Sequence, residues 1–223
     1  MAIGESEFVE NPEPRCPVVL LLDTSSSMRG APIQELNEAV ALFKSEVCQD
    51  AQASLRVELA IITFGGRCEI IQDFVTVTDF VPRPLQAIGE TPMGEAIEVG
   101  LELLQRRKEA YKQNGIYYYR PWVWLLSDGQ PTDEERWERA AKRVHAGEAA
   151  RNFSFFAVGV ERANMDILRQ IAPPGRPPVK LKGLSFKAMF LWLSASMKKA
   201  SSSKQSGEQV ALPPIDGWGT VTG

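Results

Sequence analysis

Two aspartates and three hydroxyl-bearing residues stand where they could together bind a metal ion. Asp23, Ser25 and Ser27 occupy alternate positions in the run DTSSS, Thr91 stands at a predicted helix start, and Asp128 lies in SDGQPT. All five side chains offer oxygen ligands, which favours Mg²⁺, Mn²⁺ or Ca²⁺ over zinc or copper. Two carboxylates balance a divalent charge, and three neutral hydroxyls leave the ion able to accept a further oxygen from outside.

Three separate segments must meet for these residues to share one ion. Asp23 ends the apolar run CPVVLLL and Asp128 ends PWVWLLS, and both runs are typical of parallel strands buried on both faces. Thr91 is followed by a proline, a pair that suits the start of a helix. Ligands of a doubly wound sheet bind beyond the carboxyl ends of its strands, so we expect these segments to converge at one crevice.

The rest of the chain alternates strands with helices. Two runs rich in β-branched residues, 56–64 and 67–74, are joined by Gly-Gly and predict an antiparallel hairpin at one edge of the sheet. Helical patterns follow Pro32, Thr91, Glu134, Asn164 and Ser185, and further strands are expected at Phe153 to Val160 and at the last edge, Val179 to Leu181. The prediction is an α/β fold, a doubly wound, mostly parallel sheet with an antiparallel edge strand and helices on both faces.

Composition limits the classes of function. Apolar residues form 44% of the 223 residues, enough for a full-sized core, and the net charge of −3 gives no support for nucleic-acid binding. Three widely spaced cysteines fit a reducing compartment better than a disulfide scaffold. No signal-peptide pattern precedes residue 15 and no apolar run reaches the roughly 18 residues that span a bilayer. We therefore expect a cytoplasmic protein that binds neither membrane nor nucleic acid.

The expected organisation has three parts. Residues 1–14 form a polar N-terminal segment, residues 15–200 form the α/β domain, and residues 201–223 form a tail rich in Ser and Pro. The stretch LPPIDGW within the tail is too apolar for a simple linker. We therefore expect Ile215 and Trp218 to pack on the domain or on a partner.

The candidate ligands also carry a family resemblance. The motif Asp23-x-Ser25-x-Ser27, the helix start TPMG at 91–94 and the segment LSDG at 126–129 resemble the metal-ion-dependent adhesion site of von Willebrand factor A domains. The resemblance covers roughly residues 15 to 200. It implies a Mg²⁺ ion, with Mn²⁺ or Ca²⁺ as alternatives, held directly or through water by all five residues: Asp23, Ser25, Ser27, Thr91 and Asp128. It also implies a protein partner whose Asp or Glu carboxylate completes the coordination.

Within that class the wording is similar to the tellurium-resistance Y-type branch of bacterial proteins. The similar stretches are PIQELN, TPMGEAI, LSDGQPTDE, WLSASM and LPPIDGW. The resemblance implies a scaffold or regulator in a signalling set that contains a protein kinase and a metal-dependent phosphatase. It implies a binding module and not an enzyme.

Other interpretations of the same residues remain open. Ser25 and Ser27 could be ordinary turn residues, and Asp23 could cap a helix. A metal-dependent phosphohydrolase of the haloacid-dehalogenase type also places an Asp after its first strand, but it needs a second Asp where Ser25 stands. A nucleotide-binding domain needs GxGxxG after that strand, which TSSSMRG does not supply. His145, the single histidine, lies in a predicted helix and is expected to be structural.

Overall fold

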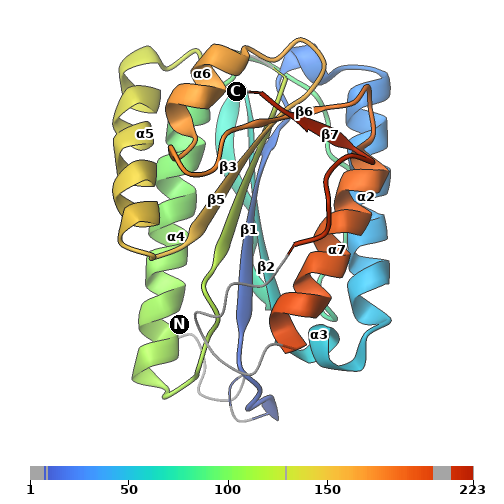
Figure 1. Cartoon of the computed structure of the whole chain (residues 1–223), viewed down its shortest axis with the longest axis vertical. Coiled ribbons are helices and arrows are strands. Elements are labelled where there is room, and N and C mark those ends of the chain that lie inside the picture. The colour runs from blue at the N-terminus through green and yellow to red at the C-terminus, as the bar shows by residue number, and fades with distance from the viewer. Residues whose placement is uncertain (1–7, 9, 129, 203–211, 223) are drawn as a thin grey trace.

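The computed structural model describes residue 8 and residues 10–128, 130–202 and 212–222. These residues form a seven-stranded sheet with the strand order β3-β2-β1-β4-β5-β6-β7 (Figure 1). The strands are β1 (Cys16–Asp23), β2 (Val57–Gly65), β3 (Arg67–Thr76), β4 (Trp122–Ser127), β5 (Ser154–Gly159), β6 (Val179–Leu181) and β7 (Gly219–Val221). The helices are η1 (Ser26–Met28), α2 (Ala31–Cys48), α3 (Ala51–Arg56), α4 (Met93–Gln113), α5 (Glu134–Ala149), α6 (Met165–Ile171) and α7 (Phe186–Ser202).

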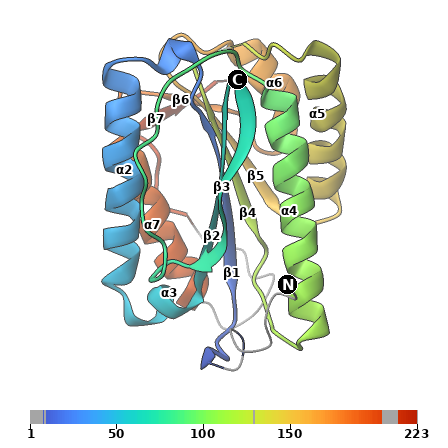
Figure 2. The same ribbon diagram turned by 180° about the vertical axis from the view of Figure 1, so that it is seen from behind.

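Helices cover both faces of the sheet. Helices α2, α3 and α7 lie on one side, and α4, α5 and α6 lie on the other, as the two opposite views show (Figures 1 and 2). Each face has its own apolar core, one built around α2 and α7 and one around α4 and α5. The doubly wound α/β prediction is confirmed. None of the described helices combines the length and apolar character needed to cross a membrane.

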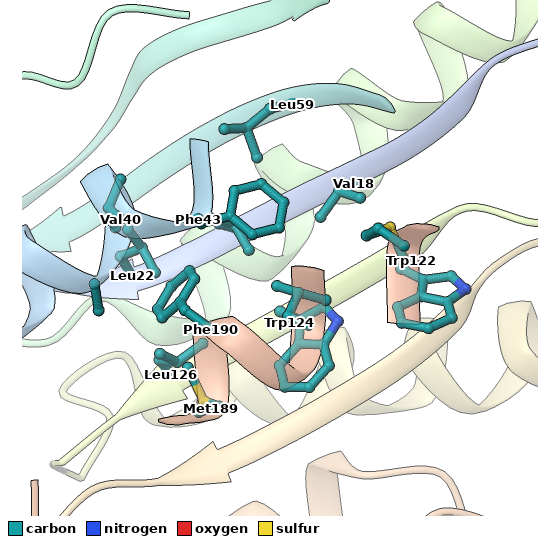
Figure 3. Close-up of a cluster of buried hydrophobic side chains, with 14 of the residues drawn as sticks. Val18, Leu22, Val40, Phe43, Leu59, Trp122, Trp124, Leu126, Met189 and Phe190 are labelled. Carbon is teal, nitrogen blue, oxygen red and sulfur yellow. The ribbon is translucent and has the colours of Figure 1, made fainter. Parts of the chain in front are cut away.

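The central strand β1 is buried along its whole length. It pairs in parallel with β2 on one side and β4 on the other. Val18 and Leu22 contribute to the core beside α2 and α7, where Phe43 and Phe190 also lie (Figure 3). The side chain of Val19 points to the opposite face of the strand and belongs to the other core. The continuous apolar run therefore reflects burial on both faces, because successive side chains of a strand point to opposite sides.

Both edges of the sheet are antiparallel. β3 pairs antiparallel with β2 through a turn at Gly66, whose φ is 69°, so the predicted hairpin edge is confirmed. The other edge differs from the prediction. β6 is followed by β7, a strand from the tail that pairs antiparallel with it, so Val179–Leu181 is not the last strand.

The tail reaches this edge because its apolar residues pack on the domain. Trp218 is 3% exposed and lies within the core beside α7, with Ile215 partly buried against that core. Both side chains thus take the packed positions expected of them. The stretch 203–211, which belongs to the predicted tail, lies outside the described residues, as do residues 1–7 of the predicted N-terminal segment.

Candidate metal centre at the carboxyl end of the sheet

The two candidate aspartates lie at the carboxyl ends of adjacent parallel strands. Asp23 is the last residue of β1, and Asp128 directly follows Ser127, the last residue of β4. The register pairs Leu22 of β1 with Leu126 of β4, so the two strand ends lie at the same edge of the sheet. The parallel alignment alone therefore brings residues about a hundred positions apart into one place.

Hydrogen bonds link the four residues of this edge into one cluster. The hydroxyl oxygens of Ser25 and Ser27 lie 2.8 Å apart, and the Ser27 hydroxyl donates to Asp128 Oδ1 at 2.6 Å. Asp23 Oδ1 accepts from the Ser25 backbone N–H at 2.8 Å, and its Oδ2 accepts from the Ser127 hydroxyl at 2.5 Å. The structure thus brings together four of the five predicted ligands.

The loop after β1 is held rigidly against the hairpin edge. It forms the short helix η1, which is anchored by the buried side chain of Met28. The Ser26 N–H donates to Gly89 O at 2.9 Å, and Thr24 O accepts from the Ile88 N–H at 2.7 Å. A Cβ added at Gly65 would lie 2.1 Å from Thr24 O, so only glycine permits this approach. The serines are therefore positioned by backbone contacts on two sides.

The sequence suggested that Thr91 would cap helix α4, and this expectation is wrong. The helix begins at Met93, its capping position falls on the intervening proline, and no side chain at that position accepts a hydrogen bond. The cap comes from another segment: Asp133 accepts from the Gly94 N–H at 3.1 Å and from the Glu95 N–H at 2.8 Å. Proline has no side-chain oxygen, so the exposed amides of the helix take a carboxylate from the neighbouring loop.

Thr91 is instead tied by its backbone to the segment that follows Asp128. Its N–H donates to the Thr132 hydroxyl at 3.2 Å, and its carbonyl accepts from the Thr132 N–H at 3.0 Å. Thr91 is 6% exposed. Among the described residues its own hydroxyl makes no hydrogen bond to the other four candidates. Its place beside the cluster follows from the link between the two loops, and its role as a ligand remains a prediction.

The cluster contains buried negative charge that the described chain does not balance. Asp23 is fully buried and Asp128 is 9% exposed, and neither takes part in an ion pair between described residues. Burial raises the pKa of Asp23 to about 6, against the opposing effect of its hydrogen bonds to Ser127 and Ser25. Burial also raises the pKa of Asp128, and the charge of Glu161 adds to this. A divalent cation would supply the missing positive charge.

The chemistry of the donors fits a hard, oxygen-preferring cation. The residues that the structure describes contain no group of three or more His, Cys, Asp and Glu side chains placed to hold a metal. The candidate centre has two carboxylates, and its other donors are hydroxyls. This composition suits Mg²⁺ or Mn²⁺ and offers nothing to a thiolate- or imidazole-preferring metal.

Sequence reasoning missed four residues around the cluster. Ser127 and Thr132 make the hydrogen bonds given above, Asp133 caps α4 from the loop after β4, and Glu161 follows β5 with a positive φ of 47°. The only available signal was their position at or beyond the carboxyl ends of strands. His145 pairs its ring Nε2 with Ala172 O at 2.9 Å, between α5 and the end of α6. That contact matches the structural role expected for it.

A family model extends this local likeness to most of the chain. The model for the von Willebrand factor type A domain matches residues 18–186. The chain belongs to this family. The match begins in β1 and ends at the start of α7, so it includes all five candidate ligands of the VWA domain.

Solved structures share the fold at low sequence identity. The vWF domain of the type V pili tip protein Mfa5 from Porphyromonas gingivalis has a TM-score of 0.62 at 10% identity, covering 88% of this chain and 99% of that one. The PilB minor pilin from Streptococcus sanguinis gives 0.61 at 12% identity, with 83% and 62% covered. The manganese-loaded TRAP protein of Plasmodium vivax gives 0.54 at 16% identity, with 81% and 73% covered.

Several of these relatives are longer proteins. The chain spans 48% of proximal thread matrix protein 1 from the mussel byssus and 62% of the pilin. None of the curated proteins matches the sequence. At these identities the likeness shows the shared fold.

Proposed function

We propose that this VWA domain is a metal-dependent protein-binding module. Its ion is Mg²⁺, with Mn²⁺ or Ca²⁺ as alternatives, and its ligands are Asp23, Ser25, Ser27, Thr91 and Asp128, some of them acting through water. The observation that carries the proposal is the hydrogen-bonded cluster of Asp23, Ser25, Ser27 and Asp128, which buries two carboxylates without a cation from the described chain.

The number of donors explains why the ion would bind a partner. Mg²⁺ prefers six oxygen ligands in octahedral geometry and usually keeps some water in proteins. Five side-chain oxygens leave at least one position to water. A carboxylate of an Asp or Glu on another protein can replace that water and brings a charge that the hydroxyl ligands lack. The proposed partner therefore presents an exposed acidic side chain.

The same donor set argues against turnover. A hydrolase needs a general base beside the reacting atoms, and both aspartates of the cluster are assigned to the ion. Ser25 stands where a haloacid-dehalogenase-type phosphohydrolase has its second aspartate. His145 is bound to Ala172 O on another element. We therefore propose a binding module without catalytic activity.

The proposed setting is bacterial signalling. The stretches TPMGEAI, LSDGQPTDE and WLSASM resemble the tellurium-resistance Y-type branch. On that basis we propose a cytoplasmic scaffold or regulator of stress resistance, whose partners are a protein kinase and a metal-dependent phosphatase.

The test begins with the metal itself. Protein freed of metal with EDTA is titrated calorimetrically with Mg²⁺, Mn²⁺ and Ca²⁺, and one saturable site is expected. Asp23→Ala should abolish it and Thr91→Val should weaken it, whereas Thr91→Ser should retain it. Asp166→Ala is the matched control, because this carboxylate is 84% exposed on α6. Absence of a saturable site for all three ions would refute the proposal.

The second stage tests binding against catalysis. Capture of partner proteins is compared for the intact protein, for Asp23→Ala and in EDTA, and both changes should weaken capture by several-fold while folding survives. Hydrolysis of generic phosphate esters with Mg²⁺ should be undetectable. A partner held equally well in all three conditions would contradict the metal mechanism, and hydrolysis that disappears in Asp23→Asn would support the enzyme instead.

A further inference from the structure

A groove runs between α4 and α5, on the face of the sheet opposite α7. The two helices lie side by side in both views (Figures 1 and 2). The groove has a volume of about 450 Å³ and is lined from both helices and from residues 152 and 153, which directly precede β5. Because β5 is parallel to β4, its start lies at the amino end of the sheet. The groove is therefore separate from the metal centre, which lies at the carboxyl end.

Lys108 of α4 is a buried cation that lines this groove. It is 8% exposed, and its ammonium donates to Asn152 O at 3.3 Å. It forms no ion pair with a carboxylate of the described residues. Burial lowers the pKa of Lys108, and the charge of Lys112 lowers it further. An ammonium has three N–H donors, so donors and charge remain that the described residues do not satisfy.

A second cation lines the groove from the opposite helix. Arg143 of α5 pairs with Glu102 at 3.2 Å, where the two side chains are 43% and 62% exposed. Exposed pairs of this kind contribute little free energy, so the Arg143 guanidinium can exchange this contact for another anion. None of the described residues that line the groove is an Asp or a Glu. The groove thus has two positive charges and no negative charge in its wall.

Apolar side chains complete the wall. Leu101, Leu104 and Phe153 line the groove together with the two cations. The volume of the groove lies within the range of about 300–1,000 Å³ that is typical of sites for small molecules. The groove therefore has room for an anion that carries an apolar group.

The charge of the wall favours a phosphate over a carboxylate. A phosphate monoester has a charge of about −1.5 to −2 at pH 7, which two cations match, whereas a carboxylate has a single charge. Lysine binds phosphate as a point charge, and the guanidinium of arginine can donate two parallel hydrogen bonds to it. Three terminal oxygens of the phosphate can accept from donors on both helices.

We propose that the groove between α4 and α5 binds a small phosphate monoester with an apolar substituent. The phosphate contacts Lys108 and Arg143, and the substituent packs against Leu104 and Phe153. Neither the metal ion nor the protein partner proposed for the metal centre takes part. The proposal therefore stands or falls independently of the proposed function.

The test uses phenyl phosphate as the probe. The ¹⁵N-labelled full chain, in a phosphate-free buffer without divalent ions, is titrated while its backbone amide resonances are followed by NMR. Phenyl phosphate should bind saturably with a dissociation constant of about 1 mM, a weak affinity that suits so small a ligand. The largest shifts are expected at Gly147 and Asn152. Inorganic phosphate and benzoate should bind several-fold more weakly, and phenol should not reach saturation.

Substitutions separate a built site from nonspecific attraction of anions. Lys108→Met keeps an apolar side chain and should abolish saturable binding. Arg143→Gln should weaken phenyl phosphate about tenfold, since it removes a charge-assisted contact, and folding should survive because this side chain is 43% exposed. Lys142→Gln, an exposed neighbour on α5 that does not line the groove, is the matched control and should change nothing. Absence of a saturable shift, equal affinity for phenol, or equal affinities of the Arg143→Gln and Lys142→Gln variants would overturn the proposal.

Discussion

Buried carboxylates lie at both ends of the sheet, and the two ends treat them differently. At the amino end, Glu58 is fully buried and accepts hydrogen bonds from Arg15 Nε at 2.7 Å and from Arg107 Nε and Nη2, both at 2.8 Å. The Tyr111 hydroxyl also donates to it. At the carboxyl end, Asp23 is equally buried, but the described residues that donate to it, Ser25 and Ser127, carry no charge.

The contrast shows what distinguishes a structural carboxylate from a candidate ligand. Burial is the same at both ends, so burial alone does not mark a functional site. At the amino end the chain supplies the counter-charge, and the Arg107 guanidinium also packs over the Phe8 ring, 5.0 Å from its centre. At the carboxyl end no described cation does so. At that end, therefore, the described residues leave buried negative charge without a counter-charge, which a bound cation could supply.

The largest effect should come from breaking the compensated end. Glu58→Gln leaves two buried guanidinium groups facing a neutral amide and should lower the free energy of unfolding by about 3–5 kcal/mol. Urea denaturation with and without Mg²⁺ measures it, and the loss should be the same in both. Glu69→Gln, which removes an exposed pair with Arg67, should cost under about 1 kcal/mol. Similar losses of stability in Glu58→Gln and Glu69→Gln would mean that the buried ion pairs stabilise the fold no more than an exposed one.

The next effect belongs to the uncompensated end. Mg²⁺ at about a hundred times its dissociation constant should raise the free energy of unfolding by about 2.7 kcal/mol, because only the folded state holds the ligands together. The gain should vanish in Asp23→Ala and persist in Tyr111→Phe. Thermal or urea denaturation in EDTA and in excess Mg²⁺ gives both values. A gain that survives Asp23→Ala would place the ion elsewhere.

A smaller loss is expected from one contact of the compensated end. Tyr111→Phe removes a hydroxyl that donates to a buried charge and should cost about 2 kcal/mol in the free energy of unfolding, independent of Mg²⁺. Tyr118→Phe is the control, since its hydroxyl makes no hydrogen bond among the described residues, and it should change stability by under about 0.5 kcal/mol. Equal effects would mean that the Glu58 network holds without the tyrosine.

The smallest effect carries the opposite sign. Asp23→Asn removes a buried charge while its amide can still contact Ser25 N–H and the Ser127 hydroxyl. In EDTA the variant should therefore be more stable than the parent, by about 1 kcal/mol. In saturating Mg²⁺ it should be less stable, because a ligand is lost. Denaturation in both buffers measures this reversal in the order of stability. If the variant were less stable than the parent in EDTA, the charge of Asp23 would not be uncompensated.

The sequence predicted those parts of the molecule that local pattern determines. β1 is a continuous apolar run ended by a carboxylate, so both the strand and the position of Asp23 at its end could be predicted. The same holds for Asp128 after β4. Helix α5 begins at Glu134 as expected, since acidic residues mark its first turn.

The remainder depends on contacts between distant residues. Glu58 appeared as one charge in a strand of apolar residues, and its partners Arg15 and Arg107 lie 43 and 49 positions away. Strand β7 has three residues and no alternating pattern, so only its pairing with β6 defines it. Asp133 stands directly before α5 in the sequence, yet its carboxylate caps α4. Neither periodicity nor spacing along the sequence indicates contacts between residues so far apart.

The separation of the site residues along the chain also sets when the site can exist. The hydrogen bonds from Ser27 to Asp128 and from Ser127 to Asp23 join positions 101 and 104 apart. They can form only after β1 and β4 have paired, and β2, β3 and α4 lie between those strands in the chain. Contacts of such long sequence separation form slowly, because loop closure must come first. An ion at the candidate centre would therefore bind only after β1 and β4 have paired, and it could not nucleate folding.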